Sequence, residues 1–127
     1  TKLNAEQLQL SSRVQALQCR VEDLKGQFNV VVANPPYIAY DDPLIAPDVK
    51  KFEPSSALFA NENGLASLRV WSEKAAELLT KDGLFVTEIG AGQEVAMRTI
   101  LSQSFRDIEE KKDYSGWVRV ISAIKKG

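Results

Sequence analysis

The sequence predicts an α/β domain whose sheet is mainly parallel, with one antiparallel strand at its carboxyl-terminal end. Apolar runs typical of strands alternate along the chain with segments whose apolar residues recur at helical spacing. Two strand-like runs then follow each other near the end, separated by Tyr114-Ser115-Gly116, which is typical of a hairpin turn. Strands that alternate with helices lie parallel because each helix crosses back over the sheet, whereas a closing hairpin reverses the last strand.

The chain has the size and composition of one globular domain. Its 127 residues are 44% hydrophobic and 26% charged, which is too apolar for a disordered chain, and no internal repeat or low-complexity segment divides it. Residues 1–127 are therefore expected to form one unit.

The first third of the sequence predicts a short helix over residues 2–10 and a short strand over residues 14–19. Residues 28–33, Phe-Asn-Val-Val-Val-Ala, are rich in β-branched side chains and predict a strand buried on both faces. This strand ends at Asn34-Pro35-Pro36-Tyr37, because a proline has no amide hydrogen to donate to a ladder. Residues 38–62 predict a long irregular connection, and such a length is uncommon unless the loop has a function.

The middle of the sequence predicts a helix from about residue 63 to about residue 80. Lys81-Asp82-Gly83 predicts the turn that ends it, and residues 84–89 predict the next strand. The apolar stripe of the helix is expected to consist of Leu65, Leu68, Trp71, Ala75, Leu78 and Leu79.

The last third predicts a second helix over residues 93–104 and a hairpin of strands over residues 108–112 and 118–124. The helix is expected to turn Val95, Met97, Ile100 and Leu101 inward. Gly90-Ala91-Gly92 precedes it and partly matches a dinucleotide phosphate loop, with Glu109 about twenty residues on. Because Val95 stands where that motif needs a third small residue, a tight strand-to-helix turn is the favoured interpretation. Glu88 either lines a pocket or caps a loop.

Composition excludes several classes of site. The chain has no histidine, which excludes Ser-His-Asp and Cys-His catalysis and any His-ligated metal. Cys19 is the only cysteine, which excludes thiolate zinc sites, iron–sulfur clusters and intrachain disulfides. We expect no metal.

Charge and hydropathy restrict the partners. Sixteen basic and seventeen acidic residues leave a net charge of -1, which provides no basic surface for nucleic acid. No apolar run approaches the roughly 20 residues of a membrane span. We expect no membrane partner and a cytoplasmic location, with an organellar one left open.

The strand exit at Asn34 carries the chemistry that the residues themselves suggest. Because Asn34 precedes a proline, it leaves the strand in an extended conformation. Pro35 and Pro36 have locked φ angles and no amide hydrogen, so the backbone there offers carbonyl oxygens without competing donors. Asn34 adds a side-chain oxygen and Tyr37 an aromatic face. This combination suits a planar –NH₂ group.

At this point the sequence resembles a known family. Phe28 to Ile38, Phe-Asn-Val-Val-Val-Ala-Asn-Pro-Pro-Tyr-Ile, is similar to the motif of methyltransferases that modify amino groups with S-adenosylmethionine. The downstream sequence resembles the narrower HemK/PrmC family, which methylates the glutamine side-chain amide of peptide-chain release factors. The segments that carry this resemblance are Pro47-Asp48-Val49, Phe52-Glu53-Pro54, Ala57-Leu58, Asn63-Gly64-Leu65, Asp82-Gly83-Leu84, Glu88-Ile89-Gly90 with Gln93, and Lys112-Asp113-Tyr114-Ser115-Gly116 with Arg119-Val120.

The resemblance implies roles for individual residues. The side chain of Asn34 and the carbonyl of Pro35 would accept the two hydrogens of the substrate amide, and the ring of Tyr37 would pack against it. Pro36 and Glu53 would also bind the substrate, and Asn34 would touch the cofactor, S-adenosylmethionine. Catalysis would rest on positioning and electrostatics, without a general base before transfer.

The chain also departs from the family pattern. The family's Gly-rich cofactor loop and the acidic residue that holds the ribose have no counterpart before Asn4. A further acidic position, near the adenine, aligns with Arg20, so that Glu22 or Asp23 would have to replace it. The resemblance thus implies the carboxyl-terminal portion of a Rossmann-like class I methyltransferase fold that lacks its first strands and is inactive alone.

Loss of those strands has a structural consequence. Residues 14–19 would lie two strand spacings, roughly 10 Å, from residues 28–33, and the new sheet edge would expose Val30 to Val32. Two other functions stay open from the sequence. One is a nucleic-acid amino methyltransferase, which shares the Asn-Pro-Pro-Tyr motif, and the other is a non-catalytic, degenerate fragment.

Overall fold

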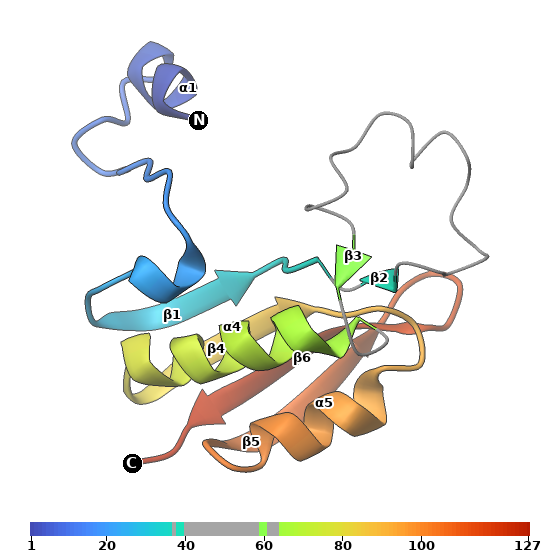
Figure 1. The fold of residues 1–127 in the computed structure, drawn as a ribbon. Helices are drawn as coiled ribbons and strands as arrows, with labels where there is room; N and C mark the ends of the chain where they lie inside the picture. The colour runs from blue at the N-terminus through green and yellow to red at the C-terminus, as the bar shows by residue number, and fades with distance from the viewer. Residues whose placement is uncertain (37, 40–58, 61–63) are drawn as a thin grey trace.

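The structure of the chain is a computed structural model that describes residues 1–36, 38–39, 59–60 and 64–127. Helices and strands alternate through its second half, as the sequence predicts (Figure 1). The elements are α1 (Lys2–Gln7), the 3₁₀ helix η1 (Val21–Asp23), β1 (Phe28–Ala33), β2 (Ile38–Ala39), β3 (Phe59–Ala60), α4 (Leu65–Leu78), β4 (Leu79–Glu88), α5 (Glu94–Leu101), β5 (Phe105–Lys112) and β6 (Val118–Lys125).

Four strands form the main sheet in the order β1-β4-β6-β5. β1 pairs parallel to β4, whereas β6 pairs antiparallel to both β4 and β5. Strands β1, β4 and β5 therefore point the same way, and only β6, the last strand in the sequence, opposes them. This confirms the expected sheet. The short strands β2 and β3 form a separate parallel pair.

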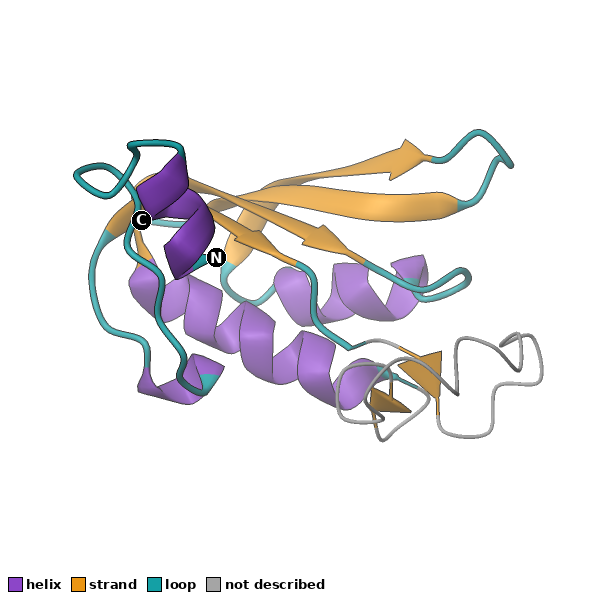
Figure 2. Cartoon of the chain, turned by 90° about the horizontal axis from the view of Figure 1, so that it is seen from above, coloured by secondary structure: helices purple, strands orange, loops and turns teal. Residues whose placement is uncertain are grey.

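Helices α4 and α5 cover one face of this sheet (Figure 2). The side chains between the two layers form the core, in which the rings of Phe85 and Phe105 stack with centroids 5.4 Å apart. From the predicted helical stripe, Leu68 and Ala75 are buried, and Trp71 packs against the core. Met97 and Leu101 of α5 are fully buried, which confirms that these positions face inward.

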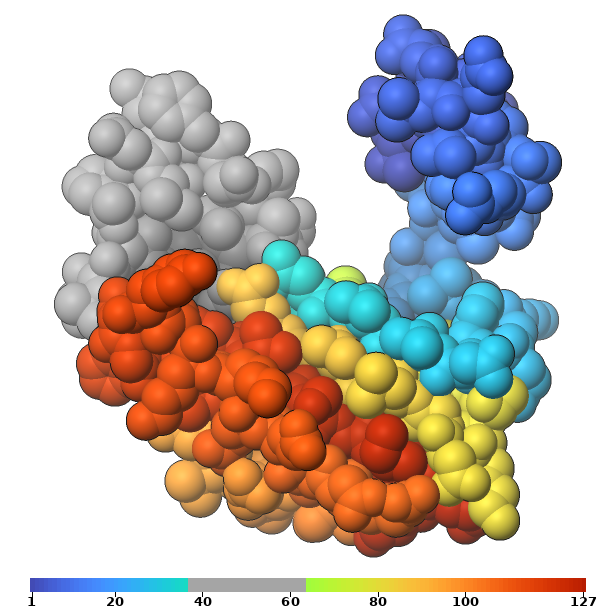
Figure 3. Space-filling view, turned by 180° about the vertical axis from the view of Figure 1, so that it is seen from behind, coloured from blue at the N-terminus to red at the C-terminus, as the bar shows by residue number. Residues whose placement is uncertain are grey.

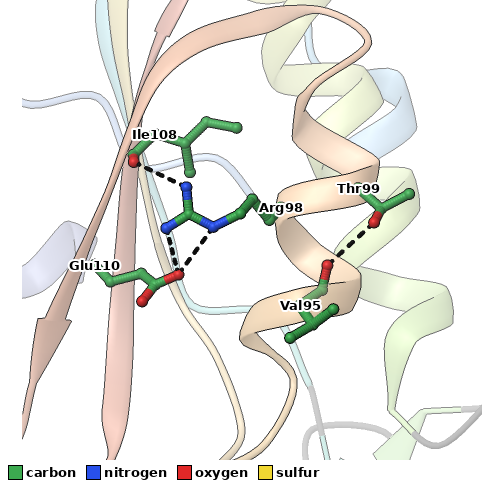
Figure 4. Close-up of polar contacts among 5 residues, drawn as sticks. All are labelled: Val95, Arg98, Thr99, Ile108 and Glu110. Atoms are coloured by element: carbon green, nitrogen blue, oxygen red, sulfur yellow. Dashed lines mark hydrogen bonds and ion pairs between the residues drawn. The ribbon is translucent and has the colours of Figure 1, made fainter.

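Arg98 fastens α5 to the edge strand β5 (Figure 4). Its Nη2 and Nε donate to Oε1 of Glu110 at 2.5 and 3.1 Å, and its Nη1 donates to the carbonyl oxygen of Ile108 at 3.4 Å. Next to Arg98, within α5, Oγ1 of Thr99 donates a hydrogen bond to the carbonyl oxygen of Val95 at 3.1 Å. Exposed ion pairs add little stability, so this contact chiefly orients the helix on the sheet.

The opposite face of the sheet is not covered by these helices. In the space-filling view the strands lie open on this side, and residues 1–20 stand away from them (Figure 3). Val30 and Val32 are 52% and 75% exposed there, whereas Val31 packs against the core. The prediction that residues 28–33 are buried on both faces is therefore wrong, because β1 is an edge strand with a helix layer on one side only. The expected exposure holds for Val30 and Val32.

The predicted strand over residues 14–19 is also wrong. These residues have no strand structure, and Val14 and Leu17 are 40% and 62% exposed. A strand is held by a ladder to a neighbour, and the sheet offers these residues no adjacent strand. They form an extended connection between α1 and η1 (Figure 1).

Several further details differ from the sequence-based prediction. Lys81-Asp82-Gly83 does not separate helix from strand but lies inside β4, as a bulge at which Asp82 has a φ of 61°. Helix α5 ends at Leu101, and β5 begins earlier than expected, at Phe105. Val95 is 74% exposed rather than inward, because two residues turn a helix by about 200° and place it opposite the buried Met97.

None of the helices in the part of the chain that the structure describes combines the length and the apolar character needed to cross a bilayer.

Candidate active site

Three chain segments lie at the end of the sheet where the parallel strands stop. Residues 34–36 follow β1, residues 89–93 follow β4, and residues 113–117 join β5 to β6. The register brings them together: Ala33 pairs with Thr87 at the end of β1, and Glu88 pairs with Val120 near the start of β6. In open α/β sheets this edge is where ligands bind.

Asn34 is exposed between two buried neighbours. Ala33 is 8% exposed and belongs to the core, and Pro35 is fully buried. Because Pro35 is also confined in φ, the backbone on both sides of Asn34 is held in place while its carboxamide faces outward. Pro36 is half-buried. The described part of the predicted motif thus presents one polar side chain on a fixed support.

Glu88 is the residue of β4 that corresponds to Asn34 of β1. Each follows directly after the last registered pair of the two parallel strands, Ala33 and Thr87. Glu88 is half-buried, and Thr87 beneath it is 1% exposed. A carboxylate and a carboxamide therefore end neighbouring strands at the candidate site.

The loop after β4 is a tight turn, which is closed by the side chain of Gln93. Oε1 of Gln93 accepts a hydrogen bond from the backbone nitrogen of Gly90 at 2.8 Å, and the backbone nitrogen of Gln93 donates to the carbonyl of Gly90 at 3.3 Å. Gly92 has a φ of +82°, a conformation that favours glycine. This geometry matches the tight turn favoured from the sequence.

The β5–β6 turn is organised by Asp113. Its Oδ1 accepts hydrogen bonds from the backbone nitrogens of Ser115 and Trp117 at 2.9 and 3.0 Å, and its Oδ2 accepts one from Nε of Arg119 at 3.0 Å. The hydrogen bond from Arg119, followed by those from the backbone, lowers the pKa of Asp113 below its usual value. The carboxylate therefore stays charged and holds the turn.

The remaining predicted site residues are not brought together with Asn34. Glu22 and Asp23 lie in η1, which packs against α4 before the start of β1, whereas Asn34 follows its end. Six strand residues, about 20 Å, separate the two ends. Glu22 pairs instead with Arg20 at 3.1 Å, and its pKa is lowered by its own backbone amide and by this side chain. Tyr37 and Glu53 lie outside the described residues.

Other features of the described residues do not add to the site. Within the described ranges no group of three or more cysteine, aspartate or glutamate residues is arranged to hold a metal ion. A shallow pocket is lined by Arg69, Ser72, Ile100 and Phe105, on the helical side of the sheet, and Asn34 is not part of its lining.

Sequence reasoning named Asp113 and Gln93 only within segments that carry the family resemblance and gave neither residue a structural role. Asp113 stands three residues before Gly116, a spacing typical of a turn closed by an aspartate side chain. Gln93 closes a loop through its side chain, and no local pattern distinguishes that role from a surface glutamine.

Comparison with known proteins identifies relatives along nearly the whole chain. The chain is 41% identical over 120 residues to the release factor glutamine methyltransferase of Salmonella typhimurium. This alignment covers 92% of the present chain and 43% of the Salmonella protein. It is 35% identical over 135 residues to the Clostridium acetobutylicum protein of the same name. That alignment covers 100% of the present chain and 47% of the Clostridium protein. The chain thus spans less than half the length of these relatives. No protein-family model matches it.

A solved structure shows the same fold. The crystal structure of a methyltransferase from Pyrococcus furiosus superposes with a TM-score of 0.55 at 14% identity, covering 82% of this chain and 44% of that one. This confirms the expected partial Rossmann-like architecture with its mixed sheet.

Proposed function

Because the chain belongs to the release factor glutamine methyltransferase (HemK/PrmC) family, we propose that it contributes the substrate-binding part of an S-adenosylmethionine-dependent enzyme that methylates a glutamine amide of a peptide-chain release factor. The observation that carries the proposal is the exposed carboxamide of Asn34, fixed between buried Ala33 and Pro35 at the ligand-binding edge of the sheet. Because release factors act in translation, we propose a cytoplasmic location, with an organellar one left open.

The proposed chemistry addresses the weak nucleophilicity of an amide. The nitrogen lone pair of a carboxamide is delocalised into its carbonyl group. We propose that the substrate –NH₂ group donates one hydrogen to the side-chain oxygen of Asn34 and the other to the carbonyl oxygen of Pro35. Two acceptors that polarise these N–H bonds increase the electron density on nitrogen and orient it toward the methyl donor. In the transfer a nitrogen–carbon bond would form as the sulfur–methyl bond of the donor breaks, S-adenosylhomocysteine would leave, and one amide proton would pass to solvent.

The proline pair supports this assignment because neither residue has an amide hydrogen. A backbone N–H at this point would compete for the acceptors that the substrate needs. Tyr37, Pro36 and Glu53 remain proposed substrate-binding residues, with the ring of Tyr37 packed against the amide.

S-adenosylmethionine, when bound, supplies an electrophilic methyl group. The described residues fit only its reacting end, at Asn34, because Glu22 and Asp23 lie before the start of β1. We therefore leave Glu22 and Asp23 out of the proposed cofactor contacts. For the same reason we propose that residues 1–127 do not transfer methyl groups by themselves.

The test is a chimera in which this chain replaces the matching 120 residues of the Salmonella typhimurium relative. The chimera is incubated with S-[methyl-³H]adenosylmethionine and a purified release factor, and transfer is located by mass spectrometry. We expect a methylated glutamine. The matched control is the same release factor with that glutamine changed to alanine.

Nucleic acid serves as the competing substrate in the same experiment. Transfer to DNA or ribosomal RNA, with none to the release factor, would replace the proposed substrate class with a nucleic-acid amino group. A folded chimera that methylates neither substrate would overturn the proposal in favour of a non-catalytic role.

A further inference from the structure

We propose that the β5–β6 turn, residues 113–117, binds the polypeptide that flanks the methyl-accepting glutamine, with the side chains of Tyr114 and Trp117 as its contact residues. This inference rests on the proposed function, because the substrate must be a protein for such a surface to be needed.

The turn lies at the sheet edge that carries Asn34. β6 begins where β4 ends, since Val120 pairs with Glu88, and Glu88 is the neighbour of Asn34 in the register. Lys112 pairs with Val118, so residues 113–117 project beyond the last pair of the hairpin, past the ends of the parallel strands (Figure 1). The turn and Asn34 thus lie at the same end of the sheet, with β4 between β1 and β6, which is roughly 10 Å across two strand spacings and within the reach of one extended peptide.

The two aromatic side chains of the turn are exposed. Tyr114 is fully exposed and Trp117 is 56% exposed, whereas Phe85 and Phe105 are 1% and 2% exposed in the core. Tyrosine and tryptophan are the residues that most often dominate protein interfaces, because each combines a large apolar ring with a hydrogen-bond donor. The donors, the Tyr114 hydroxyl and the Trp117 indole N–H, suit the carbonyl oxygens of an extended peptide.

The backbone that carries these rings is fixed. The carboxylate of Asp113 accepts hydrogen bonds from Ser115, Trp117 and Arg119, as described above. The backbone adds two more, from the nitrogen of Asp113 to the carbonyl of Trp117 at 2.8 Å and from the nitrogen of Gly116 to the carbonyl of Asp113 at 3.0 Å. A preorganised loop loses little conformational entropy on binding, which is the condition under which a few aromatic contacts give useful affinity.

The turn is also open on its outer side. Gly116 has a φ of +88°, and a Cβ atom added there would meet no atom within 4 Å. No described residue therefore packs against this point of the turn, which leaves room for a partner chain.

The experiment measures binding separately from methyl transfer. The 127-residue chain is titrated with a purified release factor by calorimetry, and Tyr114→Ala and Trp117→Ala are each expected to raise the Kd at least tenfold. Tyr114→Phe, which keeps the ring, is expected to stay within about threefold of the wild type. Val70→Ala, which removes an exposed apolar side chain from the helical side, serves as the matched control and should leave the Kd unchanged. Circular dichroism checks that each variant is folded.

The outcomes distinguish this inference from the proposed function. Equal Kd values for the wild type and both alanine variants, or no binding by the wild type, would overturn the role of the turn whatever the chimera does. Weakened binding in both alanine variants, together with a chimera that transfers no methyl group, would overturn the proposed reaction and sustain the contact surface.

A second measurement tests whether another part of the enzyme covers the turn instead. Acrylamide quenching of Trp117 fluorescence is measured in the chimera and in the 127-residue chain, both with Trp71→Phe. The relative used for the chimera has no tryptophan of its own, or its tryptophans are replaced. We expect similar quenching that falls when the release factor is added. Strong protection in the free chimera would contradict the inference, since the ring would then be an intramolecular contact.

Discussion

Arg119 reaches back across the β5–β6 turn and donates its Nε hydrogen to Oδ2 of Asp113 at 3.0 Å. The other oxygen of the same carboxylate holds two backbone amides of the turn. One ionised side chain thereby connects the start of β6 to the loop that projects at the same end of the sheet as Asn34. This contact links the stability of the turn to the charge of Asp113.

The Asp113 contact predicts a specific dependence of stability on pH. The folded pKa of Asp113 is below its unfolded value of about 3.9, so its contribution is fully present above that value and is lost as the pH falls through the folded pKa. Urea unfolding of the wild type and Asp113→Asn should show a difference in free energy that is constant near neutral pH and shrinks below about pH 4.

Arg119→Gln provides the control for this titration, because it removes the guanidinium charge and keeps the carboxylate. The difference between wild type and Arg119→Gln should shrink over the same acidic range. A difference that persists unchanged down to pH 2 in both variants would contradict the assigned role of the ion pair.

Asn34→Ala in the chimera should abolish methyl transfer to the release factor and leave the fold intact. The carboxamide is exposed, so its removal opens no cavity, but one of the two proposed acceptors for the substrate amide is lost. Initial-rate measurements with the tritiated cofactor give the activity, and thermal unfolding gives the stability.

Asn29→Ala is the matched control, since Asn29 occupies the same strand near its other end and donates to Oγ1 of Thr80 at 3.4 Å. It should keep near-normal activity. Asn34→Ala with wild-type activity would remove the basis of the proposed mechanism.

Gly83→Ala should destabilise the chain by about 1–3 kcal/mol through overpacking. A Cβ atom at Gly83 would lie 2.9 Å from the carbonyl oxygen of Thr80 and 3.2 Å from that of Asn29, and neither backbone oxygen can move freely. Chemical denaturation measures the change in unfolding free energy.

Gly92→Ala is a useful comparison because its Cβ would meet nothing within 4 Å, although its φ is +82°. We expect a cost of about 1 kcal/mol, from backbone strain alone. A Gly83→Ala variant as stable as the wild type would show that the β4 bulge is looser than the structure indicates.

Val32→Lys should reduce self-association of the chain without unfolding it. Val32 is 75% exposed on the uncovered face of the edge strand β1, and a charge on an edge strand opposes pairing with another copy. Light scattering against protein concentration measures the association. Val31→Lys tests the assignment of the faces, because Val31 packs against the core and a lysine there should unfold the chain. Equal behaviour of the two variants would contradict it.

Much of the architecture follows from local patterns. Neighbouring residues determine three of the predicted elements: the strand at the β-branched residues 28–33, the helix that carries Leu68 and Ala75, and the closing hairpin. The proline-fixed backbone at Asn34 was also foreseeable, because the φ restriction of Pro35 is a property of the residue itself. These predictions required no knowledge of what lies beside each element.

Most of the predictions that failed concern neighbours distant in the sequence; Val95 is the exception, because the helical period alone places it opposite Met97. Residues 14–19 alternate like a strand but find no strand to pair with, and Val32 is apolar yet exposed because its side of the sheet has no helix layer. Asp82 predicts a turn, yet the parallel pairing with β1 absorbs it as a bulge inside β4. A ladder or a buried face requires two partners, and a local pattern describes only one of them.

Local chemistry therefore determined most of the helices and strands and indicated the side chain that we propose holds an amide. Tertiary structure alone decided that Asn34 ends beside Glu88, that Glu22 and Asp23 lie at the far end of β1, and that the Asp113 turn shares the edge of the site. The reason is that backbone geometry and side-chain periodicity act over a few residues, whereas strand order brings together positions separated by fifty or more.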